Sequence, residues 1–306
     1  MKVVYLGTPE FAVAPLVEIA KSRHELIAVI TQPDKPVGRK AIITPCAVKV
    51  AGLNLGAEVY SFNKISVDGI SKLKELNPDI LVTCAYGQIL SQEILDVAKF
   101  GVINIHASLL PKLRGASPIQ HAIINGDKIT GVTIMQTDIG VDTGDIIKSR
   151  EIEIFDGETY GELSDRLSKL GASIIVECLD EIETGKAVKT PQNHQIATKT
   201  TLIKKEHAKI DFTKSAESIV NLIRGMNPSP VAFTFLDGKK VKIFKAKVSE
   251  CIGKSGEVLF ADNKNGLIIG AGDKSVLIEE LQLEGGKQLN AKTFLLGRKI
   301  EVGKIL

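Results

Sequence analysis

The chain has 306 residues, of which 44% are hydrophobic and 25% charged, and its formal net charge is +3; this length suggests two globular domains. No apolar run approaches the roughly 18 residues that span a bilayer, and the apolar run at the N-terminus is too short for a signal peptide, so we expect a cytoplasmic protein. The cysteines, and the histidines other than His106, show no metal-ligand spacing, which argues against a bound metal.

The first half of the sequence alternates strand and helix patterns. Short apolar runs predict strands at residues 3–6, 25–30, 80–85, 101–105, 132–137 and 146–154. Helical patterns lie between them, as at 67–76 and 92–98, and a long amphipathic helix is predicted at 160–183. This alternation predicts an α/β fold with a doubly wound, mostly parallel sheet, in which ligands bind beyond the carboxyl ends of the strands.

Two loops follow the first two strands. The first lies where a dinucleotide fingerprint would, but it keeps only Gly7 of the three glycines, which disfavours a nicotinamide-dependent oxidoreductase. Thr8 is expected to cap the next helix, with Pro9 at its first position. The second loop, 32–40, has two prolines, a glycine and three cations; it is either a solvated turn or a basic finger that reaches a phosphate backbone.

A polar pair marks the end of the 101–105 strand. Asn104 and His106 should project from one face, whereas Ile103 and Ile105 face the other way. A carboxamide can donate to a developing oxyanion and an imidazole can move protons, so the pair indicates an acyl-transfer site. The alternative is a core histidine whose hydrogen bonds are simply satisfied.

The acid for such a site would come from the Asp- and Gly-rich loop 138–145. Both Asp142 and Asp145 are candidates, since a carboxylate beside His106 would orient the ring and favour its charged form. The stretch 108–115 is predicted to be a shaped loop because it contains a proline and a glycine. Its two leucines either wall an apolar pocket or pack beneath the loop.

The chain changes character after residue 184. The polar stretch 185–201 reads as a linker, so we expect a catalytic domain at 1–186, a linker at 187–203 and a second domain at 204–306. After a short helix at 216–224, short strands are predicted at 233–236, 240–247, 256–260, 266–271 and 275–283. Asp237-Gly238 is a strong hairpin signal, and the set suggests a small β-barrel of the OB type.

Charge is distributed unevenly between the two parts. Residues 187–306 hold 20 Lys plus Arg against 12 Asp plus Glu, whereas residues 1–186 hold 19 against 24. A basic second domain favours a polyanionic partner. A solvated lysine-rich surface would have the same composition, so charge alone leaves both interpretations open.

These motifs together resemble the methionyl-tRNA formyltransferases, a family within the folate-dependent formyltransferases. The resemblance runs the length of the chain and rests on Gly7-Thr8-Pro9, Gln32-Pro33-Asp34, Gly38-Arg39, Ala85-Tyr86-Gly87, residues 104–111, Arg114-Gly115-Ala116, Pro118-Ile119-Gln120, residues 131–136, Asp142-Thr143-Gly144-Asp145 and Asn227-Pro228. Residues 104–111 and Asp142 are shared with the wider group and specify the chemistry. The 32–40 loop and the basic second domain carry the substrate assignment.

The resemblance implies roles for individual residues. Asn104, His106 and Asp142 would be catalytic, with Asp142 preferred to Asp145. The folate pocket would be lined by two segments, Ser108, Leu109, Leu110 and Pro111, and Tyr86, Gly87, Gln88, Ile89 and Leu90. Three cations of the 32–40 loop would contact tRNA: Lys35, Arg39 and Lys40. Family members often have a richer lysine cluster where this chain has Ala41-Ile42-Ile43.

The implied reaction moves the formyl group of 10-formyltetrahydrofolate, a co-substrate, to the α-amino group of methionine on charged initiator tRNA, for translation initiation. The resemblance implies a Rossmann-like catalytic domain and an OB-like tRNA-binding domain, with no metal, membrane or obligate protein partner. One alternative is a folate formyltransferase that acts on a small amine. The other is a non-catalytic RNA-binding protein, against which the intact Asn104, His106 and Asp142 argue.

Overall fold

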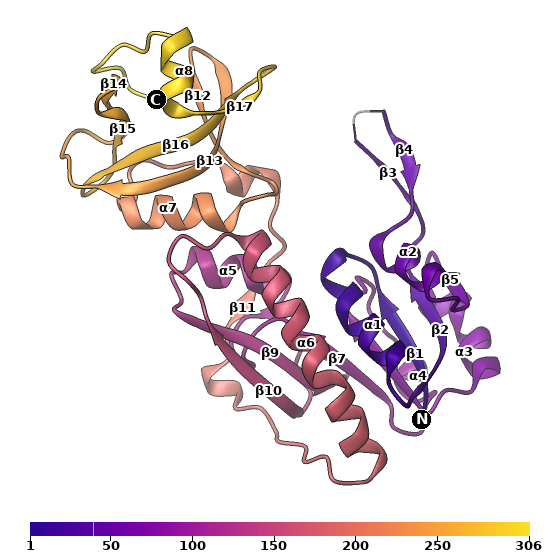
Figure 1. The fold of residues 1–306 in the computed structure, drawn as a ribbon. Coiled ribbons are helices and arrows are strands. Elements are labelled where there is room, and N and C mark those ends of the chain that lie inside the picture. Colours follow the sequence, from indigo (N-terminus) through magenta and orange to yellow (C-terminus); the bar gives the residue numbers. More distant parts are fainter. Residues whose placement is uncertain (39) are drawn as a thin grey trace. The chain divides into compact units, whose positions relative to one another are not determined.

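The computed structural model describes residues 1–38 and 40–306, and at Val37 the backbone alone. The chain divides into two compact units (Figure 1). The first unit comprises Met1–Pro118, Ile129–Ile152 and Ser164–Thr200, and the second comprises Ile119–Lys128, Glu153–Leu163 and Thr201–Leu306. Each unit is therefore assembled from segments that are separated in the sequence.

The first unit is built on a seven-stranded sheet with the order β10-β9-β7-β6-β1-β2-β5. Its strands are β1 (Lys2–Gly7), β2 (Glu25–Thr31), β5 (Val59–Ser61), β6 (Ile80–Cys84), β7 (Val102–His106), β9 (Ile129–Gln136) and β10 (Ile146–Glu153). The pairs from β5 to β7 are parallel, and β9 joins β7 antiparallel. The predicted doubly wound, mostly parallel sheet is confirmed; only the short β5 was not predicted.

Helices cover the sheet because its central strands are apolar on both faces. Within the first unit they are α1 (Val13–Lys21), α2 (Ala47–Asn54), α3 (Ile70–Leu76), α4 (Gln92–Leu95) and most of α6 (Tyr160–Glu183), whereas α5 (Pro118–Ile124) belongs, except for Pro118, to the second unit. Leu6 of β1 and Val102 of β7 belong to one buried cluster, together with Leu73 of α3. On the opposite face α6 approaches closely at Gly171, where an added Cβ would lie 3.0 Å from Ile105. None of the helices in the described part of the chain has the length and apolar character needed to span a bilayer.

The turn after β1 differs from the prediction. Pro9, rather than Thr8, occupies the N-cap position of a short 3-10 turn at Glu10–Ala12, and α1 begins only at Val13. The Thr8 hydroxyl instead donates a hydrogen bond of 2.9 Å to the Tyr86 carbonyl oxygen. The helix-cap prediction is wrong because this hydroxyl finds an acceptor that is distant in sequence.

Two predicted helices are shorter than expected. In the 67–76 region, Ile65–Gly69 forms a π-helical turn and α3 begins at Ile70. Gly69 packs tightly there, since an added Cβ would lie 2.7 Å from the Ile65 side chain. The helix predicted at 92–98 ends at Leu95, because the chain turns there towards β7.

The 32–40 loop is the start of a β-hairpin. β3 (Lys35–Val37) and β4 (Ile42–Thr44) pair antiparallel and stand away from the sheet of the first unit (Figure 1). The Ile42 and Ile43 side chains are both more than half exposed, at 61% and 62%. Arg39, one of the three cations predicted to contact tRNA, lies outside the described residues.

The segment predicted as a linker carries structure of its own. A 3-10 turn forms at His194–Ile196, and β11 (Lys199–Thr200) pairs parallel with β8 (Arg114–Gly115). Up to Thr200 this segment belongs to the first unit. It therefore lies against the loop that follows β7.

The second unit contains an antiparallel sheet with the order β12-β13-β16-β15-β14, and β17 pairs with β16. Its elements are α7 (Ala216–Gly225), β12 (Ala232–Leu236), β13 (Lys239–Ser249), β14 (Val258–Asp262), β15 (Gly266–Gly270), β16 (Ser275–Leu283), β17 (Gln288–Asn290) and α8 (Ala291–Gly297). The predicted hairpin is present: Asp237 and Gly238 have φ of 51° and 72°, as a tight two-residue turn requires.

Candidate active site

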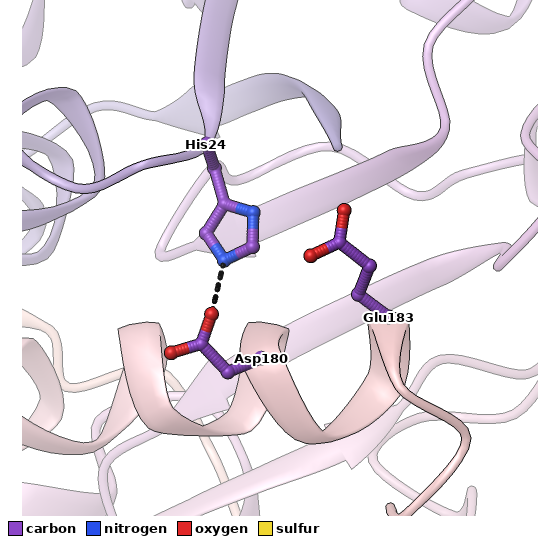
Figure 2. Close-up of side chains that lie close together, drawn as sticks. All are labelled: His24, Asp180 and Glu183. Atoms are coloured by element: carbon purple, nitrogen blue, oxygen red, sulfur yellow. Dashed lines mark ion pairs between the residues drawn. The ribbon is translucent and has the colours of Figure 1, made fainter.

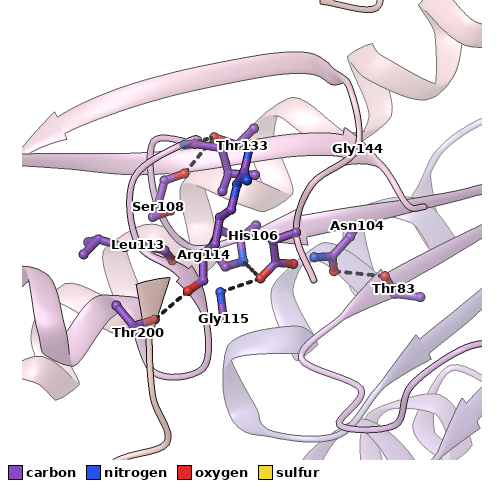
Figure 3. A network of polar contacts seen from close by, with 12 residues as sticks. Thr83, Asn104, His106, Ser108, Leu113, Arg114, Gly115, Thr133, Gly144 and Thr200 are labelled. Atoms are coloured by element: carbon purple, nitrogen blue, oxygen red, sulfur yellow. Dashed lines mark hydrogen bonds and ion pairs between the residues drawn. The ribbon is translucent and has the colours of Figure 1, made fainter. Parts of the chain in front are cut away.

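β7 brings two polar side chains to the carboxyl end of the sheet. Asn104 and His106 project from one face, while Ile103 and Ile105 are buried against the other. Figure 3 shows both polar side chains within one network of polar contacts. The predicted pairing of an amide with an imidazole is therefore present in the structure.

The carboxamide of Asn104 is oriented by the neighbouring strand. Thr83 of β6 donates a hydrogen bond of 2.9 Å to Asn104 Oδ1 (Figure 3). The Thr83 hydroxyl also lies 3.2 Å from the Ile103 carbonyl oxygen, a second acceptor for its single hydrogen. With Oδ1 on the Thr83 hydroxyl, Nδ2 is the end that carries the two N–H donors. Nδ2 has no acceptor among the described residues, so both donors are free for a ligand.

The His106 ring is buried between two acceptors. Its Nε2 lies 3.0 Å from the Leu113 carbonyl oxygen, and its Nδ1 lies 3.6 Å from Asp142 Oδ2. The Leu113 carbonyl oxygen is a hydrogen-bond acceptor for Nε2–H, whereas 3.6 Å between Nδ1 and Asp142 Oδ2 is an ion-pair distance just beyond hydrogen-bond range. The contact with Leu113 holds Nε2, and Nδ1 is directed at the carboxylate.

Asp142, rather than Asp145, places its carboxylate beside His106. The Asp142 Oδ2 atom also accepts a hydrogen bond of 2.7 Å from the Gly115 N–H (Figure 3). Asp145 contributes its backbone carbonyl, which accepts from the Gln136 N–H at 2.9 Å. The geometry thus distinguishes two acids that the sequence pattern left equivalent.

A threonine of the neighbouring strand fixes the first part of the loop after β7. Thr133 of β9 donates from its hydroxyl to the Ser108 carbonyl oxygen at 2.7 Å and accepts from the Leu110 N–H at 3.1 Å. The Ser108 hydroxyl donates to the Lys112 carbonyl oxygen at 2.7 Å. Ser108 and Leu110 are buried, whereas Leu109 and Pro111 are partly exposed.

The second predicted folate segment is divided between core and surface. Tyr86 and Leu90 belong to the buried cluster of the sheet, and burial raises the pKa of Tyr86 to about 12. Gln88 is anchored, because its side chain accepts from the Ile65 N–H and donates to the Phe62 carbonyl oxygen. Gly87 is exposed, and Ile89 is 84% exposed.

The described cations of the 32–40 loop are at the surface. Lys35 donates from Nζ to Gln32 Oε1 at 3.1 Å, and Lys40 is exposed. Gln32 in turn donates to the Gly87 carbonyl oxygen at 2.9 Å, so the start of the hairpin is bonded to one of the predicted folate segments.

Sequence reasoning did not single out four residues that organise this site, namely Thr83, Arg114, Thr133 and Gln192. Thr83 and Thr133 lie inside apolar strands, where a lone threonine has no distinctive pattern. Gln192 lies in the segment predicted as a linker. Arg114 was noted only within the family motif, and its burial, at 4% exposure, was not expected.

A second cluster of titratable groups lies away from this site. His24, Asp180 and Glu183 have potential ligand atoms within 4.8 Å of one another (Figure 2). Arg23 pairs with both carboxylates, and the Met1 amino group lies 3.0 Å from Glu183 Oε1. These cations already neutralise the carboxylates, so we interpret the cluster as an ion-pair network between the start of β2 and the end of α6.

Comparison with known proteins places this geometry in a family. A formyl transferase family model matches residues 1–179, and a model of the formyl transferase C-terminal domain matches residues 202–299. A methionyl-tRNA formyltransferase of Acetivibrio thermocellus is 42% identical, and the match covers 100% of this chain and 99% of that protein. A methionyl-tRNA formyltransferase of Agathobacter rectalis is 45% identical, and the match covers 99% of this chain and 98% of that protein.

Solved structures share the fold. The sugar 3N-formyl transferase WlaRD, crystallised in the presence of dTDP and 5-N-formyl-THF, is 25% identical with a TM-score of 0.69 and covers 94% of this chain and 99% of its own. HypX from Aquifex aeolicus in complex with tetrahydrofolic acid is 19% identical, with a TM-score of 0.66 over 96% of this chain; the chain spans about half of HypX, at 47%. The two family models and the full-length relatives show that the chain belongs to the formyl transferase family.

Proposed function

We propose that the chain transfers the formyl group of 10-formyltetrahydrofolate to the α-amino group of methionine on charged initiator tRNA. The observation that carries the proposal is the cluster at the end of β7, in which Asn104 presents free N–H donors beside His106 and Asp142. Relatives named methionyl-tRNA formyltransferase at 42% and 45% identity over nearly the whole chain support the acceptor.

The chemistry follows from the three side chains. The amine attacks the formyl carbon, and a tetrahedral oxyanion forms. Asn104 Nδ2–H would donate to this oxyanion, and the His106 imidazolium would add positive charge nearby. The bond between the formyl carbon and folate N10 then breaks, the new C–N bond remains, and the proton lost by the amine passes to N10.

Asp142 would act through His106 and through water. Its carboxylate lies 3.6 Å from Nδ1 and so stabilises the imidazolium. It is also the nearby group that can accept a proton from the attacking amine through a bridging water. No covalent enzyme intermediate is needed in this sequence of steps.

We propose that folate binds against the loop of Ser108, Leu109, Leu110 and Pro111 and the segment from Tyr86 to Leu90. Leu109, Pro111 and Ile89 are the apolar side chains of these segments that are accessible at the surface. Tyr86 and Leu90 would support the segment by packing in the core beneath it, since both are buried. Leu110 would do the same for the loop.

We propose that residues 204–306 and the loop cations Lys35, Arg39 and Lys40 bind the tRNA. The β12–β13 hairpin places Phe233 opposite Lys242 and Phe235 opposite Lys240. The Lys240 ammonium lies 3.9 Å from the centre of the Phe233 ring, and Phe235 is 42% exposed. Phe233 is partly buried against the core, so Phe235 is the exposed ring of the pair. An exposed aromatic ring near lysines suits a nucleic acid, because rings stack on bases and ammonium groups neutralise phosphates.

A formyltransferase acting on a small amine is the second candidate. The similarity to WlaRD, with a TM-score of 0.69, favours it as far as the fold is concerned. The full-length relatives named methionyl-tRNA formyltransferase, at 42% and 45% identity, favour tRNA.

The test is an acceptor comparison with 10-formyltetrahydrofolate as donor. Charged initiator tRNA, charged elongator methionine tRNA, free methionine and an amino sugar nucleotide are offered separately. We expect formylation of the charged initiator alone. Preferential formylation of free methionine or of the sugar would contradict the proposal.

A further inference from the structure

The stretch 190–200, which we call the strap, is bonded to both loops that hold His106. At one end Thr190 and Ile146 exchange two backbone hydrogen bonds of 2.8 Å. At the other end the Thr198 carbonyl oxygen accepts from the Arg114 N–H at 2.9 Å, and the Thr198 hydroxyl accepts from the Leu113 N–H at 2.8 Å. Leu113 is the residue whose carbonyl oxygen contacts His106 Nε2.

Gln192, in the middle of the strap, is bonded to the loop that carries Asp142. It is 5% exposed, and its Nε2 donates to the Asp142 carbonyl oxygen at 3.0 Å and to the Gly144 carbonyl oxygen at 2.7 Å. Its Oε1 accepts from Arg114 Nε at 3.0 Å and Nη2 at 2.6 Å. Both donors and both acceptor positions of this carboxamide are used, so its orientation is fixed.

The Asp142 loop requires such support. Asp142 has a φ of 53°, in the left-handed region that residues other than glycine adopt infrequently. At Gly144 an added Cβ would overlap the Gln136 carbonyl oxygen, so the loop lies tightly against β9. Gln192 binds the carbonyl groups of both residues and thereby stabilises the conformation that directs the carboxylate to His106.

Arg114 is the support for Gln192. Its guanidinium contacts Gln192 and lies 3.2 Å from His194 Nδ1, and it has no ion-pair partner among the described residues. Burial of a guanidinium without a carboxylate is unfavourable unless its N–H groups are satisfied by other hydrogen-bond acceptors. Here these hydrogen bonds assign the oxygen of Gln192 and thereby aim the amide nitrogen at the Asp142 loop.

We propose that Gln192, oriented by Arg114, is a positioning residue that holds the Asp142 carboxylate beside the His106 ring for formyl transfer. The inference rests on the proposed function, because it assumes that Asp142 takes part in the reaction. It makes the strap, expected from the sequence to be a passive linker, a part of the active site.

The first test compares three variants. Gln192→Ala removes all four hydrogen bonds. Gln192→Glu keeps the shape and the acceptors for Arg114 but replaces the donor that faces two carbonyl oxygens. Gln195→Ala changes an exposed glutamine of the same strap and is the matched control. We expect kcat to fall about 10- to 100-fold in both Gln192 variants, since displacement of a reacting group by about 1 Å has effects of that size.

The KM values for tRNA and for folate are expected to stay within about twofold of wild type, because Gln192 acts on Asp142 rather than on the substrates. A wild-type kcat in Gln192→Glu would overturn the proposal, since this variant preserves the packing and the bonds to Arg114. Equal losses in Gln192→Glu and in the Gln195→Ala control would overturn it as well.

A double-mutant cycle separates positioning from general stability. If Gln192 acts through Asp142, Gln192→Ala should lower kcat by less than about twofold when Asp142→Ala is already present. A loss as large as in the wild-type background would overturn the proposal. An Asp142→Ala single variant with normal kcat would contradict the role proposed for Asp142 and would overturn this inference with it, whereas the acceptor comparison tests the proposed function separately.

Discussion

Thr83 on β6 donates a hydrogen bond of 2.9 Å to Asn104 Oδ1 on β7, where the two residues are direct neighbours in the parallel register. The bond holds Oδ1 against β6 and leaves Nδ2 for the site. Without it the amide could rotate and present its oxygen to the developing oxyanion, which would be repulsive.

Replacement of Thr83 by valine should therefore lower kcat without unfolding the strand. Valine has nearly the same shape and suits a buried strand, but it cannot donate. We expect kcat to fall about five- to tenfold, which corresponds to a hydrogen bond of about 1 kcal/mol. Thr83→Ser, which restores the hydroxyl, should recover most of the activity. Steady-state kinetics with saturating substrates checks this, and equal kcat in the two variants would refute the orienting role.

Replacement of Asn104 by alanine should have a larger effect. Loss of one oxyanion donor typically lowers kcat about 10²–10³-fold. Because Asn104 is partly exposed, the melting temperature should change little. Asn63→Ala, at an exposed position, is the matched control for removal of a carboxamide. Near-normal turnover of Asn104→Ala would show that the oxyanion is stabilised by another group.

The sheet and the polar pair could be predicted because both depend on local periodicity. Apolar runs of strand length define β1, β2, β6 and β7, and alternation along β7 alone places Asn104 and His106 on one face. The choice between Asp142 and Asp145 could not be made in this way. Both lie in a loop whose sequence has no hydrophobic periodicity, and the contact between Asp142 Oδ2 and the Gly115 N–H joins residues far apart in sequence.

The supporting residues were missed for the same physical reason. Gln192 is 50 residues from Asp142 and 78 from Arg114, so nothing in its local sequence distinguishes it from a solvated linker residue. Thr8 shows the converse error. Its local pattern is that of a helix cap, but its hydroxyl bonds to the Tyr86 carbonyl oxygen on another segment. Hydrogen bonds between distant loops form only in the assembled fold, and they produce no periodic pattern in the sequence.

The His24 cluster predicts a pH dependence of stability. Burial is the main cause that lowers the pKa of His24 below its ordinary value, and the nearby Met1 ammonium adds to it, while Asp180 and Glu183 act in the opposite direction. Below about pH 6.5, the ordinary value for histidine, the unfolded chain therefore binds a proton that the folded chain does not. The free energy of unfolding should fall as the pH is lowered from 7 through this range.

Unfolding of His24→Gln between pH 5 and pH 7 tests this dependence. The variant should show a flatter pH profile than wild type, whereas His207→Gln, at an exposed position, should keep the wild-type slope. Direct NMR titration of His24 gives an independent measurement. Titration at or above the ordinary histidine value would contradict the assignment.

The hairpin β12–β13 predicts the salt dependence of tRNA binding. Each lysine that neutralises a phosphate contributes about one unit to the slope of log Kd against log salt. Lys240→Gln combined with Lys242→Gln should therefore weaken tRNA binding and lower that slope by about two units. Lys245 and Lys247 on the same strand already pair with Glu279, so their double replacement by glutamine should change the slope less. Binding measured over a range of salt concentrations compares the two pairs, and equal slopes in wild type and the Lys240 and Lys242 variant would exclude this hairpin from the tRNA interface.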